Sequence, residues 1–383
     1  MKYLSLFLCL LLLAGCAQTP EPVPETTLQE AVPPETAAAT AATLPPETVP
    51  PDPIRLLLNE MSLEERVGQL FLARCDEVNA LAHIEEYHLG GFVLFGRDFE
   101  EETISSMRDK LTEYQSAAKI PLLIAVDEEG GTVTRISSNP AFRSSKFLSP
   151  RNAYKQGGFD LAFQQEQEKA QLLSSLRINV ILGPVCDITT DSSAFMYSRS
   201  LGQDKYTTGD FVYATVRAML HQGVGSCLKH FPGYGNNIDT HTAMAYDSRS
   251  LAQLEETDLF PFACGIAAGA DAILVSHTIV ECLDPETPAS LSPAVHAYLR
   301  ETMDFGGVIV TDDLVMQAIT DVYGAGEAAV LAVLAGNDLL CSTEYVTQYE
   351  AVLTAVLEGR IDIDTLNNAV RRVLQWKTDL GLI

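Results

Sequence analysis

Residues Lys229–His241 hold the densest group of side chains that could do chemistry. The segment reads KHFPGYGNNIDTH, and its glycines and proline predict a loop that leaves a strand. Asp239 and His241 stand two positions apart, a spacing at which a carboxylate can accept a hydrogen bond from an imidazole N–H and raise the basicity of the ring. The pair therefore predicts a general acid/base. The alternatives are an Asx-type turn beside an exposed histidine and a metal ligand, although no further His or Cys stands at a metal-ligand spacing.

Two adjacent acids, Asp312 and Asp313, follow the apolar run Val308–Val310 after a single threonine. We expect one of them to face inward and the other to point outward or into a helix N-terminus. Adjacent acids at a helix start commonly do no more than complement the helix dipole. A carboxylate that faces the anomeric carbon of a sugar has a different use, because it can form a covalent glycosyl-enzyme intermediate.

Polar residues follow other short apolar runs in the same way. Asp127 follows Leu122–Val126, Asp187 comes shortly after Asn179–Leu182, Lys229 and His230 follow Ser226–Leu228, and His277 comes just after Ala272–Val275. Barrel enzymes place their chemistry at the carboxyl ends of successive parallel strands. A single such residue is usually a strand-end cap, but five in order predict one shared site.

The elements that must position these residues alternate between strand and helix. The candidate strands are a segment near Gly68–Leu72, then Gly91–Phe95, Leu122–Val126, Asn179–Leu182, Ser226–Leu228, Ala272–Val275, Val308–Val310 and Asp338–Cys341. Amphipathic stretches such as Asp160–Leu176 and Glu327–Leu334 lie between them, and Ser62 and Glu65 have the spacing of a capping box. This alternation predicts an α/β fold, a TIM-type (β/α)8 barrel forming a single catalytic domain, although a doubly wound sheet gives the same local pattern.

The first 53 residues do not belong to that domain. Residues 1–16 read MKYLSLFLCLLLLAGC, a secretory signal whose end resembles a lipobox, at which the thiol of Cys16 would be diacylated. Residues 17–53 contain no Lys, Arg, Gly or aromatic residue and predict a disordered linker rich in Pro, Thr and Glu. We therefore expect an extracytoplasmic lipoprotein, anchored to the cell membrane through Cys16, with its catalytic domain in residues 54–383. An ordinary signal with an incidental cysteine, and a low-complexity interaction tail, are the alternatives.

The net charge and the cysteine pattern limit which partners and cofactors the protein is expected to bind. The chain has 25 Lys and Arg against 51 Asp and Glu, a net charge of −26, which argues against nucleic-acid binding. A chain with this net charge is also poorly suited to adsorb to an anionic membrane surface, so the lipid on Cys16 would have to supply the membrane anchoring. The cysteines beyond the signal and Cys16 are scattered singly without C-x-x-C spacing, and we expect most to be small buried hydrophobes. We predict no metal site and no cofactor.

Seven motifs together resemble glycoside hydrolase family 3, in its single-barrel β-N-acetylglucosaminidase branch. The resemblance covers about Met61 to Ile319 and weakens beyond. The motifs are MSLEERVGQL at Met61–Leu70, VDEEGG at Val126–Gly131 with Arg135 eight residues after Asp127, RSLG at Arg199–Gly202, the Lys229–His241 segment, VSH at Val275–His277, PASLS at Pro288–Ser292 and GVIVTDDLVM at Gly307–Met316.

By that resemblance, Asp312 is the nucleophile and His241 is the acid/base, oriented by Asp239. The substrate-binding residues that it implies are Asp127, Arg135, Arg199, Lys229, His230 and His277. The implied activity is that of a retaining exo-β-N-acetylglucosaminidase acting on β-linked N-acetylhexosamine in peptidoglycan or glycan fragments. A β-glucosidase, a glycosyl phosphorylase on the same barrel and a catalytically silent sugar-binding lipoprotein are the alternatives.

Three residues depart from the family pattern. Glu128 stands where Gln is common, Leu201 where Phe is common, and Tyr234 where His is common. All three flank the residues assigned to the chemistry, so we expect them to affect substrate preference more than activity. The short C-terminal tail leaves no room for the second domain of the family's β-glucosidases, which favours the N-acetylglucosaminidase branch.

Overall fold

The computed structural model describes residues 52–241 and 243–383. The predicted signal, Cys16 and the linker up to residue 51 lie outside the described residues. Asp52 caps the first helix by accepting from the Ile54 N–H, and Pro53 begins that helix. The first described helix therefore includes Pro53, the last residue that composition assigns to the linker.

Eight parallel strands form the centre of the fold in the order β10-β1-β2-β3-β4-β5-β7-β9. They are β1 (Phe71–Arg74), β2 (Gly91–Leu94), β3 (Leu123–Val126), β4 (Val180–Ile181), β5 (Gly225–Phe231), β7 (Ala272–Val275), β9 (Val308–Thr311) and β10 (Leu340–Ser342). A parallel bridge between Val310 and Leu339, with an N–H···O bond of 3.1 Å from Leu339 to Ile309, joins the two edge strands. The sheet closes on itself, which confirms the predicted barrel and excludes the doubly wound alternative.

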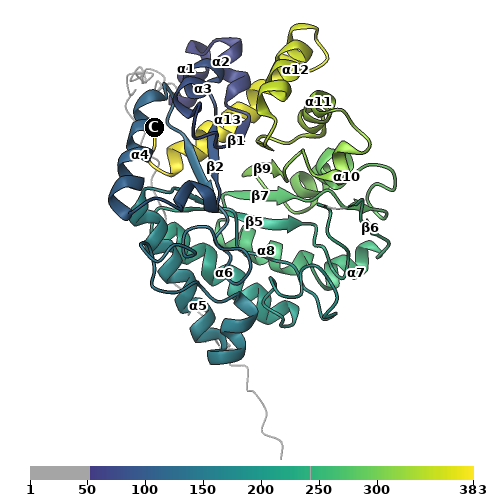
Figure 1. Ribbon diagram of the computed structural model, residues 1–383. Helices are drawn as coiled ribbons and strands as arrows, with labels where there is room; N and C mark the ends of the chain where they lie inside the picture. The colour runs from purple at the N-terminus through teal and green to yellow at the C-terminus, as the bar shows by residue number, and fades with distance from the viewer. Residues whose placement is uncertain (1–51, 242) are drawn as a thin grey trace, which may run out of the picture. The chain divides into compact units, whose positions relative to one another are not determined.

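Helices and short helical turns surround these strands (Figure 1). They are α1 (Pro53–Glu60), α2 (Leu63–Gly68), α3 (Ala80–Tyr87), η1 (Gly96–Phe99), α4 (Ile104–Ala117), α5 (Pro150–Leu176), α6 (Lys205–His221), α7 (Leu251–Glu256), α8 (Leu259–Ala268), η2 (Ala289–Leu291), α9 (Pro293–Ala297), η3 (Tyr298–Thr302), α10 (Gln317–Thr320), α11 (Ala325–Ala335), α12 (Tyr345–Leu357) and α13 (Ile363–Asp379). Two further strands, β6 (Tyr246–Asp247) and β8 (Ile279–Val280), pair in a small separate ladder.

The first strand begins later than the sequence predicted. Ser62 and Glu65 form the expected capping box at the start of α2, and Gly68 ends that helix instead of starting a strand. A Cβ at Gly68 would lie 2.0 Å from the carbonyl oxygen of Tyr87, so only glycine lets the chain approach α3 this closely. Strand β1 starts at Phe71, which moves its polar end to Arg74.

The base of the barrel, where the strands begin, is filled by the C-terminal helix. Val373 and Trp376 of α13 pack with the inward-facing residues of the strands. Gly225 at the start of β5 leaves space for the indole, because a Cβ there would lie 2.7 Å from Nε1 of Trp376. Figure 1 shows α13 in yellow, and this helix packs on α1, α2 and β9.

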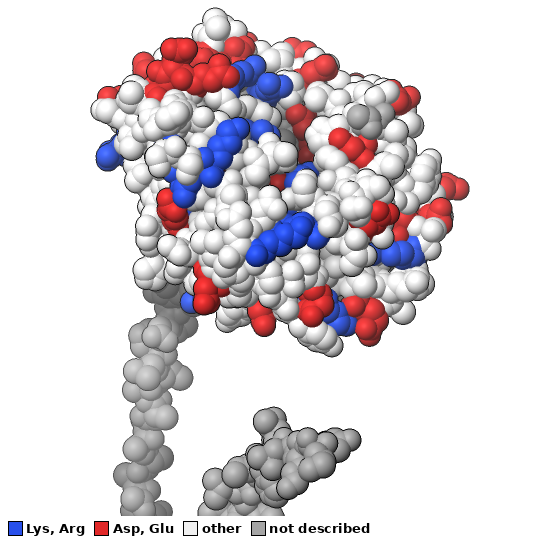
Figure 2. All heavy atoms as spheres, turned by 60° about the horizontal axis from the view of Figure 1, so that its bottom comes forward, with Lys and Arg blue, Asp and Glu red and all other residues white. Residues whose placement is uncertain are grey.

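The six cysteines within the described residues are unpaired: four are buried, Cys264 is partly exposed and Cys282 is exposed. None of the helices in the described ranges combines the length and the apolar character needed to cross a bilayer. On the face shown in Figure 2, Lys and Arg side chains lie singly or in small groups among acidic and uncharged ones.

Candidate active site

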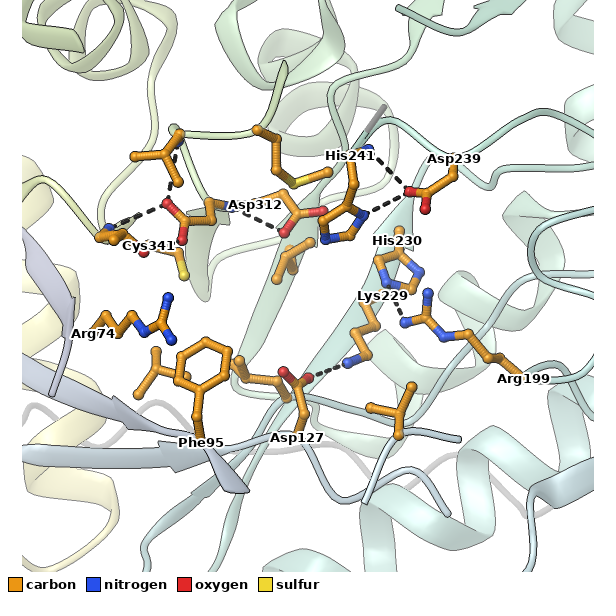
Figure 3. A pocket seen from close by; sticks show the side chains of 18 of the residues that line it. Arg74, Phe95, Asp127, Arg199, Lys229, His230, Asp239, His241, Asp312 and Cys341 are labelled. Atoms are coloured by element: carbon orange, nitrogen blue, oxygen red, sulfur yellow. Dashed lines mark hydrogen bonds and ion pairs between the residues drawn. The ribbon is translucent and has the colours of Figure 1, made fainter. Parts of the chain in front are cut away.

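A cavity of about 810 Å³ opens at the carboxyl ends of the barrel strands. Eight of the nine residues predicted to act in catalysis or substrate binding line it: Asp127, Arg135, Arg199, Lys229, His230, Asp239, His241 and Asp312. They come from the ends of β3, β5 and β9 and from the loops that follow β3, β4 and β5 (Figure 3). The ninth, His277, lies behind the cavity wall.

Asp312 directly follows β9, and its backbone N–H donates to the carbonyl of Val275 at 3.0 Å. One carboxylate oxygen, Oδ1, accepts from the Asp313 N–H at 2.9 Å. Burial alone would raise the pKa of the Asp312 carboxyl, but the neighbouring histidines and the Asp313 N–H more than offset burial and hold that pKa below its usual value. Asp312 is therefore ionised at neutral pH.

The neighbouring acid, Asp313, has a different task. Its carboxylate accepts from the Val315 N–H at 3.2 Å and from both the N–H and the hydroxyl of Thr343, at 3.2 and 2.5 Å. Asp313 thus ties the turn after β9 to the end of β10. The second oxygen of Asp312 accepts no hydrogen bond from the described residues, so Asp312 is the acid of the pair with an oxygen available to a ligand.

His241 and Asp239 form the pair that their spacing predicted. Oδ1 of Asp239 accepts from the His241 backbone N–H at 2.9 Å and lies 2.6 Å from Nδ1 of its ring. This contact leaves Nε2 as the ring nitrogen free to exchange a proton with a ligand. Figure 3 shows the ring beside the Asp312 carboxylate, and the Phe195 ring packs edge-on against it with centroids 6.2 Å apart. The His241 side chain remains 59% exposed, so it reaches the cavity from its open side.

A cluster of paired charges lies on another side of the cavity. Lys229 Nζ contacts Asp127 Oδ1 at 2.5 Å and Glu129 Oε1 at 2.7 Å. Arg199 binds Glu129 through Nε at 2.8 Å and Nη2 at 2.6 Å. Burial alone would raise the pKa of Glu129, but Arg199 and Lys229 hold it well below its usual range. The Arg135 guanidinium lies 3.8 Å from Asp127. These pairs present charged hydrogen-bond donors and acceptors in fixed positions, as recognition of sugar hydroxyls requires.

His230 joins this cluster to the loop after β4. Asp187 Oδ2 lies 2.9 Å from its Nδ1 and also accepts from its backbone N–H at 3.1 Å. Nε2 of His230 lies 3.1 Å from Nη2 of Arg199. An arginine can only donate, so Nε2 accepts and Nδ1 carries the proton toward Asp187.

Of this network, Glu129 is absent from the site that the sequence predicts, and Asp187 belongs to it only as a strand-end residue without an assigned role. Glu129 stands in the same VDEEGG motif as Asp127, and Asp187 follows the run Asn179–Leu182. The spacing of Glu129 from Asp127 places it near the same strand end. Its pairing with Arg199 and Lys229 joins segments 70 and 100 residues apart, which local patterns do not show.

His277 differs from its predicted substrate-binding role. Its ring is fully buried; Nδ1 lies 2.7 Å from the Ser290 hydroxyl and Nε2 lies 3.0 Å from the carbonyl oxygen of Asp313. Burial lowers the pKa of His277 and favours the neutral ring. A carbonyl only accepts, so Nε2 carries the hydrogen. His277 supports the Asp312–Asp313 turn from behind, and Ser290 of the PASLS motif orients it.

The three departures from the family pattern also have structural explanations. Glu128 is buried, and its carboxylate accepts from the N–H groups of Arg135 and Ile136 and from the Ser137 hydroxyl. It therefore shapes the loop that carries Arg135. The Tyr234 hydroxyl bonds to Thr240, and its ring packs edge-on against His230 at 5.3 Å. Leu201 is buried in a small apolar cluster.

The Lys229–His241 loop is held from outside by one arginine. Arg249 pairs with Asp247 at 2.6 Å and with Asp258. Gly233 has φ +113°, and a Cβ there would lie 2.4 Å from the Cβ of Asp258. The glycine thus allows the loop to lie against this ion pair.

No group of three or more His, Cys, Asp or Glu side chains within residues 52–241 and 243–383 is arranged to hold a metal ion. The cavity thus combines a carboxylate that can act as a nucleophile, an imidazole oriented to exchange a proton, and a wall of fixed charged side chains.

Comparisons with known proteins point to the same chemistry. The family described as "Glycosyl hydrolase family 3 N terminal domain" matches residues 62–376. A "Beta-hexosaminidase" of Xylella fastidiosa (strain M12) is 33% identical over 301 residues, which are 76% of this chain and 88% of that protein.

Among solved structures, a family 3 β-N-acetylglucosaminidase from Paenibacillus sp. str. FPU-7 is 32% identical with a TM-score of 0.78, covering 84% of this chain. The match spans 63% of that chain's length. A β-N-acetylhexosaminidase from Beutenbergia cavernae DSM 12333 is 26% identical with a TM-score of 0.73, covering 83% of this chain and 99% of its own. The chain is thus a glycoside hydrolase, and it belongs to glycosyl hydrolase family 3.

Proposed function

We propose that the protein is a retaining exo-β-N-acetylglucosaminidase that removes terminal β-linked N-acetylhexosamine from peptidoglycan or other glycan fragments. The observation that carries the proposal is the meeting of an ionised carboxylate, Asp312, and an oriented imidazole, His241, in one cavity. The relatives that carry the names β-hexosaminidase and β-N-acetylglucosaminidase support the choice of sugar.

In the first step, an oxygen of Asp312 attacks the anomeric carbon, and the bond from that carbon to the leaving oxygen breaks. His241 protonates the leaving oxygen through Nε2, so the aglycone departs neutral and a glycosyl–Asp312 ester remains. In the second step, neutral His241 takes a proton from water, which attacks the anomeric carbon and releases Asp312. Asp239 supports both steps, because it fixes the tautomer and stabilises the imidazolium.

The paired charges would hold the sugar during both steps. Asp127 and Lys229 lie across the cavity from Asp312 (Figure 3), and Arg199 and His230 extend the same polar wall. Glu129 already orients Arg199, and Asp187 already orients His230. These side chains therefore lose little conformational freedom when a substrate binds. His277 acts indirectly, by supporting the turn that presents Asp312.

The test uses an aryl β-N-acetylglucosaminide and the full chain. We expect the wild type to release the aryl group, and Asp312→Ala to lower kcat by about 10⁴-fold or more, because no covalent intermediate can form. Asp313→Ala is the matched control, with a smaller loss because Asp313 holds Thr343. A fluorinated donor should trap an adduct, and peptide mass spectrometry should locate it on Asp312. Undiminished turnover by Asp312→Ala would refute the assignment.

The same assay separates the other activities. Faster cleavage of a glucoside would favour a β-glucosidase, and formation of a sugar 1-phosphate on addition of phosphate would favour a phosphorylase. Binding of the sugar without release of the aryl group would favour a silent sugar-binding protein.

We further propose that the protein acts outside the cytoplasm as a lipoprotein, with Cys16 as the lipidated residue and residues 17–53 as a spacer. The support is the signal-like start, the Leu-Ala-Gly-Cys sequence and the composition of the spacer. Cys16→Ala should move the protein from the membrane fraction to the soluble fraction. Retention in the membrane fraction would contradict the anchor.

A further inference from the structure

The tip of the loop that carries the acid/base pair is largely open to solvent. The side chains of Asp239 and His241 are 30% and 59% exposed. Thr240 lies between them and is the single buried residue of the described stretch 236–241. Exposed side chains do little to hold a backbone in place. A bond to the Thr240 side chain is therefore well placed to fix both members of the pair.

Thr240 is bound from two sides. Its hydroxyl bonds to the hydroxyl of Tyr234, and its carbonyl oxygen accepts from the Ala318 N–H at 3.3 Å. Ala318 belongs to α10, which follows the turn that presents Asp312. In Figure 3 the His241 ring lies beside the carboxylate of Asp312. The two bonds of Thr240 thus hold the tip of the loop close to the nucleophile.

Tyr234 is itself fixed by the polar wall of the cavity. Its side chain is buried, and its backbone N–H donates to Asp187 Oδ1 at 2.7 Å. Its ring packs edge-on against His230 and lies 5.7 Å from the ring of Phe195. A side chain locked by such packing presents its polar end in one place. The Tyr234 hydroxyl therefore offers Thr240 a fixed partner.

We propose that Tyr234 is a positioning residue for the acid/base pair, and that its hydroxyl, through Thr240, keeps His241 within reach of the leaving oxygen and of the attacking water. The inference rests on the proposed glycosidase function. A displacement of about 1 Å can cost a catalytic group about 10²-fold in rate, so a bond one residue away from His241 can control turnover. In this role Tyr234 affects activity, whereas its departure from the family pattern predicted mainly an effect on substrate preference.

The experiment compares two glycosides that share the sugar and differ in the leaving group, and it uses the full chain. The dinitrophenyl β-N-acetylglucosaminide needs little protonation of its leaving oxygen, whereas the methoxyphenyl β-N-acetylglucosaminide depends on the acid. The readout is the ratio of kcat/KM for the dinitrophenyl over the methoxyphenyl glycoside. A change in sugar binding alters both values alike, so a change in the ratio reports on acid catalysis.

We expect this ratio to rise about 10-fold in Tyr234→Phe, which keeps the ring and loses the hydroxyl; a positioned acid supplies about 10²–10⁴-fold in all. Thr240→Val removes the other hydroxyl and should raise the ratio as much, whereas Thr240→Ser keeps a hydroxyl and should raise it less. The double variant Tyr234→Phe/Thr240→Val should be no worse than either single variant, because each removes the same bond. Thr240→Val also gives the test if Tyr234→Phe does not fold.

The second chemical step gives an independent readout. Azide can attack the anomeric carbon of the glycosyl–Asp312 ester and release Asp312, and this attack needs no base because azide carries no proton to remove. Added azide should therefore raise kcat for the dinitrophenyl glycoside in Tyr234→Phe, with formation of the glycosyl azide. It should raise kcat much less in the wild type, in which His241 already activates water.

Tyr114→Phe is the matched control. Tyr114 is buried on α4, its hydroxyl lies 4.0 Å from Cys75 Sγ, and it is not among the described residues that line the cavity. Loss of this hydroxyl should leave the ratio at its wild-type value and produce no response to azide.

An unchanged ratio in Tyr234→Phe and Thr240→Val would overturn the proposal even if activity falls, because the two hydroxyls would then act on folding or sugar binding alone. A raised ratio without a response to azide would also overturn it, since one imidazole serves both steps. If the wild type cleaves neither glycoside, or if His241→Ala leaves the ratio unchanged, the proposed function itself fails, and this inference fails with it.

Discussion

The two ends of the barrel bury charged groups in different ways. At the mouth, Lys229 and Glu129 pair with other side chains, and the pairs border a cavity. At the base, acids bind the beginnings of strands: the partly buried Asp271 accepts from the Ser226 N–H at 2.9 Å, and the buried Asp338 accepts from the Ile309 N–H at 2.9 Å while it also pairs with Arg300 and Arg372. The base is closed by Trp376 of α13.

This difference separates activity from stability within one sheet. Charged side chains at the mouth border a cavity in which a ligand can contact them, whereas Asp271 and Asp338 at the base bind backbone N–H groups of the strands. In barrel enzymes the two ends are expected to divide their roles in this way. Changes at the mouth should therefore alter turnover, and changes at the base should alter the free energy of unfolding.

After Asp312→Ala, the largest effect is expected at the mouth, from His241→Ala. Loss of a general acid/base lowers kcat by about 10²–10⁴-fold, and more for poor leaving groups than for good ones. The melting temperature should not change, because the side chain is 59% exposed. Steady-state kinetics across a series of aryl glycosides tests this, together with a thermal melt. A loss of activity that is the same for every leaving group would contradict the acid role.

At the base, Trp376→Ala should lower the free energy of unfolding by about 3–5 kcal/mol, because it leaves a cavity against Gly225. Urea unfolding measures the loss. The kcat of the protein that remains folded should be retained, since the indole lies at the opposite end of the barrel from the chemistry. A large fall in kcat with an unchanged free energy of unfolding would contradict the separation of stability at the base from activity at the mouth.

Lys377 at the base should respond to pH. Its ammonium is buried, donates to Gln69 Oε1 at 2.6 Å, and has its pKa lowered by burial from 10.5 to about 7. Between pH 7 and 10.5 the unfolded chain binds a proton that the folded protein does not, so stability rises with pH across this window. Below pH 7 both states are protonated and the destabilisation is complete.

Lys377→Met should therefore stabilise the protein at pH 7 by about 2 kcal/mol, after allowance for the unpaired Gln69 oxygen. The gain should disappear toward pH 10.5. Denaturant unfolding at pH 7 and pH 10 measures both values, and a gain that is equal at the two pH values would contradict the burial argument.

The smallest effect is expected at the mouth, from Glu128→Gln. The Gln amide oxygen can still accept from the N–H groups of Arg135 and Ile136, while the Ser137 hydroxyl must find a new geometry. We expect stability to change by about 1 kcal/mol or less and kcat/KM to change by about threefold or less. Calorimetry and kinetics together test this. A much larger loss in kcat/KM would mean that Glu128 itself contacts substrate.

The sequence by itself determined the alternation of strands and helices and the strand ends at which the site lies, whereas closure of the sheet into a barrel was decided by the structure. The strands are short apolar runs and the helices are amphipathic, and both are local patterns. The polar residues after Leu122–Val126, Ser226–Leu228 and Val308–Val310 lie at one end because parallel strands share a direction. The Asp239–His241 contact joins residues two positions apart, so it too was predictable from spacing.

Only the tertiary structure decided what each polar residue does. Asp313 is bound by Thr343, 30 residues away, and this contact leaves Asp312 as the acid with an available oxygen. His277 is turned away from the cavity by Ser290, and Arg74 is left without a carboxylate. A side chain's role depends on which partners share its surroundings, and closure of the barrel brings those partners together from distant parts of the chain.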